Sequence, residues 1–371
     1  MKKIKNLFLM CFVFIALFTL TSCLGIDQNT TLQFTILPEE QYVVDSYSEE
    51  EFKDAVQITV NGNQVVSLAE LELAGATVSK VDFSTPGKQT VVISYEGAIL
   101  TYEFYVVAAA PYVAQIGDQK YATLKEAFAA APANTETTIQ LISDKVYRNI
   151  SADFITVAAN QNIIFDLNGH TVKAYLVNQK SITFFGVNGQ LTIMDSSETK
   201  NGAIKAEGMY NSDPYYVSVA VIKNWAGGKL TINSGNVIND CGTASLSYAI
   251  DAYQNSVTVI NGGHIESKTY RAIRLFANST TQYTTLEVHG GKIQSLNNNA
   301  IWFQAPSKGK SALVKAVFDG GEVISGGEYQ GTPRYSINLA GDGEIDKFEV
   351  EITAGAYINR PENLPTEYFV K

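Results

Sequence analysis

The feature that most constrains this chain is a repeat of about 30 residues that runs through its second half. In each repeat a glycine follows an apolar strand at the start of a turn, where it allows a positive φ. These glycines are Gly169, Gly202, Gly235, Gly263, Gly291, Gly321 and Gly355. Gly202 fits least well, because a polar loop separates it from its strand. Self-similarity at this period indicates a solenoid in which each repeat packs on its neighbours.

Several columns of the aligned repeats stay apolar while their neighbours vary, so we expect these side chains to point inward. The columns of the first strand are Ile232, Ile260, Val288, Phe318 and Ile352, and then Val237, Ile265, Ile293 and Val323. The inward residues of a second strand, about halfway round, are Ile250, Ala252, Ile273, Leu275, Ile301 and Phe303. Two clear strands per repeat, with room for a third, predict a parallel β-helix. A leucine-rich repeat lacks its consensus here, and a propeller would need four strands per repeat.

A short helix is predicted before the repeats. Thr123 and Glu126 have the spacing of a capping box, and apolar residues then share one helix face. These residues are Leu124, Ala127, Phe128 and Ala131. We expect the helix to cover the open end of the solenoid, since an uncapped coil would expose backbone donors and a hydrophobic cross-section. Residues 109–146 are therefore assigned as a capping segment, and residues 147–371 as the β-helix.

The block from Ile116 to Ala127 resembles the N-terminal entry of many bacterial surface β-helix proteins. At the level of fold, the whole repeat region resembles the pectate-lyase-like β-helix family. That resemblance implies a right-handed parallel β-helix. The motifs of pectate lyases and polygalacturonases are not found in the chain.

Residues 31–108 alternate apolar and polar residues in short runs, which is the strand signal. Examples are Leu32–Ile36, Val56–Val60 and Thr90–Tyr95, and glycine-containing turns separate the runs. This spacing predicts a small β-sandwich. Residues 82–97 resemble the closing hairpin of bacterial immunoglobulin-like domains, and the resemblance implies a spacer module. The predicted fold class is therefore all-β, with a small sandwich followed by the capped β-helix.

The N-terminus has the pattern of a secretory signal. Lysines at positions 2, 3 and 5 precede an apolar run over residues 7–20, which is too short for a comfortable membrane span. The sequence Leu20-Thr21-Ser22-Cys23 resembles the bacterial lipobox, which implies a diacylglyceryl group on the Cys23 thiol. We expect residues 1–22 to be removed and residues 23–30 to form a lipidated tether. The protein would then be secreted and anchored to the bacterial membrane, facing outside the cytoplasm. An uncleaved anchor or an ordinary signal peptide is the alternative.

The charge balance is acidic, with a net charge of −10 and a pI of about 4.9. Without a basic excess, nucleic acid and anionic lipid are poor partners. Cys241 is the one cysteine beyond Cys23, so no intrachain disulfide or cysteine metal motif is predicted, and we expect it to be a small, partly buried turn residue. No cofactor or metal is predicted.

Alternation on the second strand points the remaining side chains outward, and stacking of the repeats aligns them in two files. One file is Lys223, Asp251, Arg274, Trp302 and Asn338, and the other is Trp225, Tyr253, Phe276, Gln304 and Ala340. Flat aromatic rings stack on sugars, while polar side chains hydrogen-bond hydroxyl groups. The candidate ligand-binding residues are Trp225, Asp251, Tyr253, Arg274, Phe276, Trp302 and Gln304. Alternatively, loops such as residues 305–315 cover these rings, or the rings only stiffen the sheet.

The leading hypothesis is a non-catalytic, adhesin-like lipoprotein that binds carbohydrate or glycoprotein. A second hypothesis is a polysaccharide lyase or glycoside hydrolase acting near Asp251 and Arg274. Such enzymes need converging carboxylates, and no second acid lies in that file. A third is an architectural or protein-adhesion scaffold.

Other polar positions suggest turn chemistry. The column Asn233, Asn261, His289 and Asp319 is predicted to bond its own backbone, and His170 and His264 to be solvated turn residues.

Overall fold

The computed structural model describes residues 30–38, 41–44, 47–108, 111–148, 150, 154–177, 181–209, 218–242, 246–304, 311–329, 332–340 and 344–358. The predicted signal peptide and Cys23 lie outside these residues. The chain divides into two compact units, residues 1–108 and residues 109–371, which are described separately.

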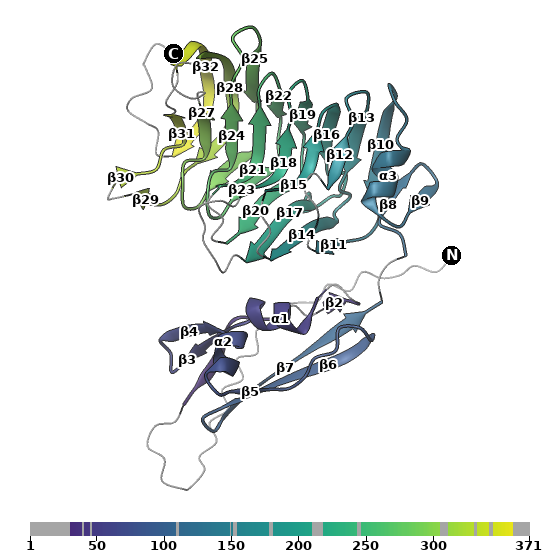
Figure 1. The fold of residues 1–371 in the computed structure, drawn as a ribbon, viewed down its shortest axis with the longest axis vertical. Coiled ribbons are helices and arrows are strands. Elements are labelled where there is room, and N and C mark those ends of the chain that lie inside the picture. Colours follow the sequence, from purple (N-terminus) through teal and green to yellow (C-terminus); the bar gives the residue numbers. More distant parts are fainter. Residues whose placement is uncertain are drawn as a thin grey trace. The chain divides into compact units, whose positions relative to one another are not determined.

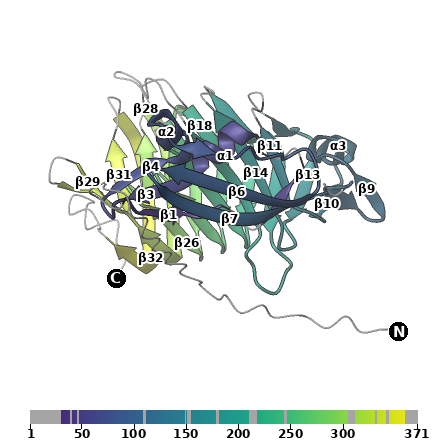
Figure 2. The same ribbon diagram turned by 90° about the horizontal axis from the view of Figure 1, so that it is seen from below.

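The N-terminal unit contains two small sheets. Strands β1 (Leu32–Ile36), β3 (Gln57–Val60) and β4 (Gln64–Ser67) form an antiparallel sheet. The second sheet has the order β2 (Gln41–Val43), β7 (Ala98–Val107), β6 (Gly87–Tyr95) and β5 (Thr77–Val78). Strands β6 and β7 form a long antiparallel hairpin in which they lie side by side (Figure 2), while β2 pairs with β7 in parallel. The strands predicted in this region are confirmed.

Two short helices interrupt these strands, where the sequence analysis predicted none. They are α1 (Glu49–Ala55) and α2 (Leu68–Leu73). Each begins with a capping box, in which Ser48 pairs with Glu51 and Ser67 with Glu70. Both helices bury an apolar face in a core that contains a cluster of aromatic rings. The rings are Tyr42, Tyr47, Phe52, Phe83 and Phe104.

The second unit is a parallel β-helix, in which equivalent strands of successive coils pair side by side (Figure 1). The first face contains β10 (Glu136–Leu141), β13 (Asn162–Asp166), β16 (Gln190–Met194), β19 (Lys229–Ile232), β22 (Val257–Ile260) and β25 (Tyr283–Val288). The second face contains β11 (Lys145–Arg148), β14 (Thr171–Val177), β17 (Ala203–Met209), β20 (Asn236–Cys241), β23 (His264–Ser267) and β26 (Lys292–Ser295). The third face contains β12 (Ile155–Val157), β15 (Ile182–Val187), β18 (Ser218–Asn224), β21 (Leu246–Tyr253), β24 (Ile273–Phe276), β27 (Ile301–Gln304) and β31 (Ile337–Ala340).

The last coils depart from this regular pattern. Strand β28 (Ser311–Ile324) pairs with both β25 and β26 and so joins the first two faces into one sheet. Strand β32 (Glu344–Ile358) pairs in parallel with β28, and the short strands β29 (Glu328–Tyr329) and β30 (Thr332–Pro333) pair with each other. The parallel β-helix predicted from the repeat is confirmed, including the third strand for which each repeat has room.

The interior of the β-helix holds the residues that the repeat predicted. Every side chain of the predicted inward columns is buried, and all except Ile352 are completely inaccessible. Because these residues come from all three faces, each coil closes around its own apolar layer and stacks on the layers above and below. Burial of this kind is the main favourable contribution to folding of a solenoid.

Crowding at the turn explains the recurrent glycines. Gly263 has a φ of 81°, and a β-carbon built on it would lie 2.5 Å from the carbonyl oxygen of Gly235 in the preceding coil. Stacked turns therefore exclude any side chain there, in addition to favouring the left-handed conformation. Gly202 lies in register with Gly235, but it is not among the glycines with positive φ in the described chain.

Helix α3 (Leu124–Ala130) packs against the first coil. Its predicted capping box between Thr123 and Glu126 is confirmed. The Phe128 ring lies 5.4 Å from the Phe165 ring and 5.8 Å from the Phe185 ring. Before it, β8 (Ala114–Ile116) and β9 (Gln119–Tyr121) form a hairpin, and β8 pairs with β10 in antiparallel fashion. Helix and hairpin together cover apolar residues at the start of the β-helix.

Cys241 differs from its predicted place in a turn with partial burial. It is the last residue of β20 and is completely buried in the apolar core. Burial raises the pKa of its thiol, because the thiolate would lose its hydration. The residue is therefore a small core side chain. A search of the described residues for a helix with the length and apolar character of a membrane span found none.

Candidate functional site

The two outward files predicted on the second strand lie on the third face in the predicted register. Asp251 pairs with Lys223 on one side and with Arg274 on the other, and Trp302 and Asn338 continue the file. In the neighbouring file, the pairs are Tyr253 with Phe276, Phe276 with Gln304, and Gln304 with Ala340. We call this surface the aromatic face and define it by Lys223, Trp225, Asp251, Tyr253, Arg274, Phe276, Trp302 and Gln304.

The aromatic rings of the second file lie next to each other from coil to coil, tilted by 59° and 31° between neighbours, and are partly exposed. The ring centroids of Trp225 and Tyr253 lie 5.8 Å apart, and those of Tyr253 and Phe276 lie 4.8 Å apart. The strands hold this spacing because the parallel register places equivalent residues of adjacent coils next to each other. The result is a continuous row of rings on a rigid sheet.

The protein's own cations lie over several of these rings. Lys223 Nζ is 3.8 Å from the centroid of Trp225 and 5.0 Å from that of Tyr253. The Arg274 guanidinium lies 4.6 Å from the Tyr248 ring and 5.6 Å from the Phe276 ring. Such contacts are attractive, and they also cover part of the ring surface. A ligand on this face would therefore meet alternating rings and positive charges.

Asp251 serves the framework of this face. Although alternation directs it outward, it is only 1% exposed, and its two carboxylate oxygens accept hydrogen bonds from Arg274 Nε and Nη2 at 2.8 and 2.7 Å. Lys223 Nζ lies 3.9 Å from the same carboxylate. Burial lowers the pKa of Arg274, but the charge of Asp251 outweighs it, so the pKa stays above its ordinary value. This bidentate pairing does not favour Asp251 as an acid or base in catalysis.

Polar contacts continue from this pair toward the last coils. Arg274 Nη1 donates to the Gln304 side-chain oxygen at 3.3 Å. Of the loop that was predicted as a possible cover, residues 305–310 lie outside the described residues, and residues 311–315 belong to β28.

Three residues that sequence analysis did not select complete the site. Tyr248 is completely buried under Arg274, and Arg271 lies between Tyr270 and Trp302. Tyr270 and Arg271 precede β24, and Tyr248 lies within β21. The tyrosines shortly before Asp251 and Arg274 were the signal that could have identified these residues.

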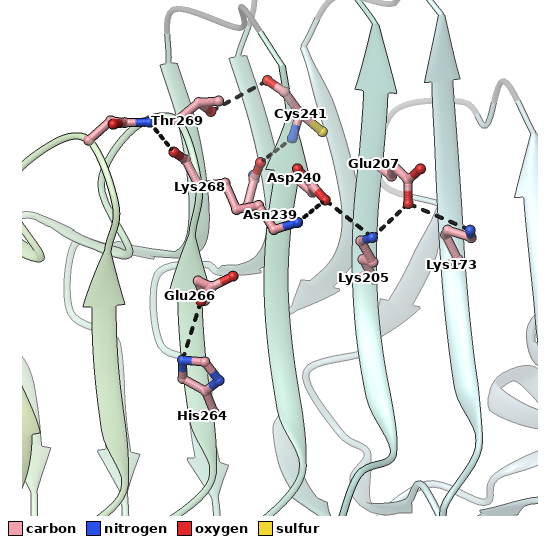
Figure 3. Close-up of polar contacts among 11 residues, drawn as sticks. Lys173, Lys205, Glu207, Asn239, Asp240, Cys241, His264, Glu266, Lys268 and Thr269 are labelled. Atoms are coloured by element: carbon pink, nitrogen blue, oxygen red, sulfur yellow. Dashed lines mark hydrogen bonds and ion pairs between the residues drawn. The ribbon is translucent and has the colours of Figure 1, made fainter. Parts of the chain in front are cut away.

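A second group of charged residues lies on the second face and forms what we call the ion ladder (Figure 3). Glu207 contacts Lys173 at 3.5 Å and Lys205 at 2.7 Å, while Asp240 contacts Lys205 at 3.2 Å and Lys268 at 2.6 Å. The ladder therefore crosses four successive coils. Sequence analysis missed it, although the register aligns Lys173 with Lys205 and Glu207 with Asp240 on adjacent coils.

Electrostatics within the ion ladder favour the charged forms. Burial lowers the pKa of Lys205, but Glu207 and Asp240 outweigh that effect and raise it. Burial raises the pKa of Glu207, yet Lys173 and Lys205 hold it below its ordinary value. Because each carboxylate has cationic neighbours, the ladder resembles a structural brace between coils more than a reactive centre.

The polar turn column bonds differently from the prediction. Asn261 Nδ2 donates to the Asn233 side-chain oxygen at 2.8 Å, and His289 Nδ1 lies 2.6 Å from Asp319 Oδ1. These side chains thus contact the next coil, and the predicted bonds to their own backbone are wrong. Stacked turns bring equivalent residues of adjacent coils within hydrogen-bond distance of each other. The Asp319 contact raises the pKa of His289.

The other two histidines also have acidic neighbours. His264 was predicted to be solvated, but it begins β23, is partly buried, and lies 3.6 Å from Glu266. Burial lowers its pKa. His170 remains in a turn, where Nδ1 lies 3.2 Å from Asp144.

Within the described residues, no three histidine, cysteine, aspartate or glutamate side chains gather closely enough to hold a metal ion. No protein-family model matches the chain, and no curated protein and no solved structure is significantly similar to it. Support for a function of the aromatic face therefore comes from the geometry of its side chains.

Proposed function

We propose that this protein binds carbohydrate, free or on a glycoprotein, through the aromatic face of its β-helix. The observation that carries the proposal is the row of neighbouring rings of Trp225, Tyr253 and Phe276, which are partly exposed beside polar groups. Sugar rings present apolar faces that stack on such rings and hydroxyl groups that bond to amides and charges. A sheet with a fixed repeat suits a polymer whose units also repeat.

The side chains have separate roles in this proposal. Tyr253, Phe276 and Trp225 supply the stacking surface, and Gln304 offers an amide at its end. Asp251 positions Arg274 and Lys223 beside the rings, where their positive charges border the ligand. Asp251 itself does not react in this scheme, which makes the face a binding surface.

The proposal also includes a lipid anchor on Cys23 and a spacer role for the immunoglobulin-like N-terminal unit. The lipobox-like sequence supports the anchor, since two acyl chains bind a membrane stably. Expressed in a bacterial host, the protein should partition with the membrane and take up labelled fatty acid. The Cys23→Ala protein should do neither, and fatty-acid labelling of that variant would overturn the assignment.

Binding is tested by a glycan-array screen of the purified protein beside the Tyr253→Ala variant. We expect retention of at least one class of glycan, and a loss of about tenfold or more in the variant, because one stacked ring contributes on the order of 1.5 kcal/mol. Tyr105→Ala is the matched control, since Tyr105 is 52% exposed on β7 of the other unit. Absence of retained glycan, or equal loss in both variants, would contradict the proposal.

A further inference from the structure

Arg271 has an unusual setting at the edge of the aromatic face. Its guanidinium lies 3.8 Å from the centroid of Trp302 and 4.3 Å from that of Tyr270, and Nη1 donates to the Tyr270 hydroxyl. The residue is only partly exposed. Two aromatic rings thus hold the guanidinium plane in one orientation and remove part of its hydration.

No acidic partner compensates this charge. Arg274, three residues later, has a bidentate bond to Asp251, whereas no carboxylate of the described residues contacts Arg271. Its Nε atom is buried without a hydrogen-bond acceptor, and so is the Nε1 atom of Trp302, whose ring the guanidinium covers. Buried donors without acceptors cost free energy, so two adjacent ones indicate a missing acceptor.

The local charge supports the same conclusion. Lys223 and Arg274 contact the single carboxylate of Asp251, and Arg334 adds positive charge near Arg271. Burial, together with Arg334, lowers the pKa of Arg271. The whole chain has a net charge of −10, so this edge is locally positive on an acidic protein. An anion would be attracted here and would relieve the repulsion between the cations.

We infer that the edge formed by Arg271 and Trp302 binds an oxyanion of the ligand, a carboxylate or a sulfate ester. The Nε side of a guanidinium presents two parallel donors that match such a group. The indole Nε1 of Trp302 adds a third donor. Placing the oxyanion on a saccharide rests on the proposed function, and it extends that function from glycans in general to acidic ones.

Inorganic sulfate is the probe that tests the subsite without any sugar. The protein is titrated with sodium sulfate at constant ionic strength against sodium chloride. Occupancy is followed by tryptophan emission in the Trp225→Phe background, where Trp302 is the sole emitter. We expect saturable sulfate binding, weakened about tenfold or more in Arg271→Gln, because a charge-assisted hydrogen bond is lost. Lys125→Gln is the matched control, since Lys125 is another stacked cation, 4.2 Å from the Phe154 ring. It should bind sulfate as the parent does.

A further variant and the combined sulfate and glycan results separate the oxyanion subsite from the proposed function. Arg271→Lys keeps the charge but loses the paired donors, so it should fold normally and bind sulfate more weakly than the parent. Sulfate binding without any glycan retention would support the subsite and contradict the proposed function. Retention of neutral glycans with no preference for sulfate over chloride would support the proposed function and contradict the oxyanion subsite. Carboxylated and sulfated forms of one retained glycan then identify which oxyanion is preferred.

Discussion

At the scale of single residues, the stacked turns can approach closely because glycine has no β-carbon. Gly263 and Gly227 have nearly equal φ values of 81° and 82°, but their surroundings differ. A β-carbon on Gly263 would meet the Gly235 carbonyl oxygen at 2.5 Å, whereas nothing lies within 4 Å of one on Gly227. The pair therefore separates steric crowding between coils from the backbone preference for glycine.

We predict that Gly263→Ala lowers the free energy of unfolding by about 3 kcal/mol, from left-handed strain plus a clash between coils. Gly227→Ala should cost only about 1 kcal/mol, because it carries the strain alone. Urea unfolding followed by circular dichroism measures both. Equal losses would show that the turns can separate to admit a methyl group, which would contradict the close stacking.

Whether a side chain points inward or outward was predictable where the period-two alternation of a strand alone decides it. The inward columns and the outward register of Asp251 followed from period two and the repeat. The burial of Asp251 did not follow, because it depends on how the long side chains of Lys223 and Arg274 fold over a shorter one. The place of Arg271 was missed for a related reason, since it precedes the regular strand.

At the scale of elements, the strands of the β-helix were predictable from the sequence, and the helices of the N-terminal unit were not. The capping boxes at Ser48 and Ser67 are the same signal that identified α3 at Thr123. Helices α1 and α2 are short, so they hold too few apolar residues to show a helical period. Tertiary packing of Phe52 and Leu68 in the core decides in favour of helix.

The ion ladder gives a prediction about cohesion between strands. Replacing Lys205 with Met leaves Glu207 and Asp240 close together without their shared cation, and should lower the free energy of unfolding by about 2 kcal/mol at neutral pH. The same substitution at Lys229, which is exposed on β19, should cost almost nothing.

The effect of Lys205→Met should depend on pH. The folded pKa values of Glu207 and Asp240 are lowered, so their stabilising contribution exists above the unfolded values and disappears as the pH falls through the folded ones. The difference between variant and parent should therefore shrink below about pH 4. Urea unfolding at pH 7 and pH 3 measures it, and a difference that stays constant would argue against charge pairing as its cause.

At the scale of the whole molecule, a regular solenoid turns a short sequence pattern into a long surface. Each coil adds one ring or one charge to the aromatic face, and the interior needs only a small set of apolar residues. The overall acidity disfavours large anionic partners, but the local positive edge around Arg271 does not follow from the net charge. Composition gives only the average charge of the surface, whereas binding depends on where the fold places positively charged residues together.

The aromatic face also contains both tryptophans of the chain, Trp225 and Trp302. Intrinsic tryptophan fluorescence therefore reports on this face alone. The most direct measurement is a titration with a glycan retained on the array, with tryptophan emission and heat of binding recorded on the same samples. We predict that both signals saturate at the same ligand concentration. Binding heat that saturates while the tryptophan emission stays unchanged would place the site elsewhere and contradict the account.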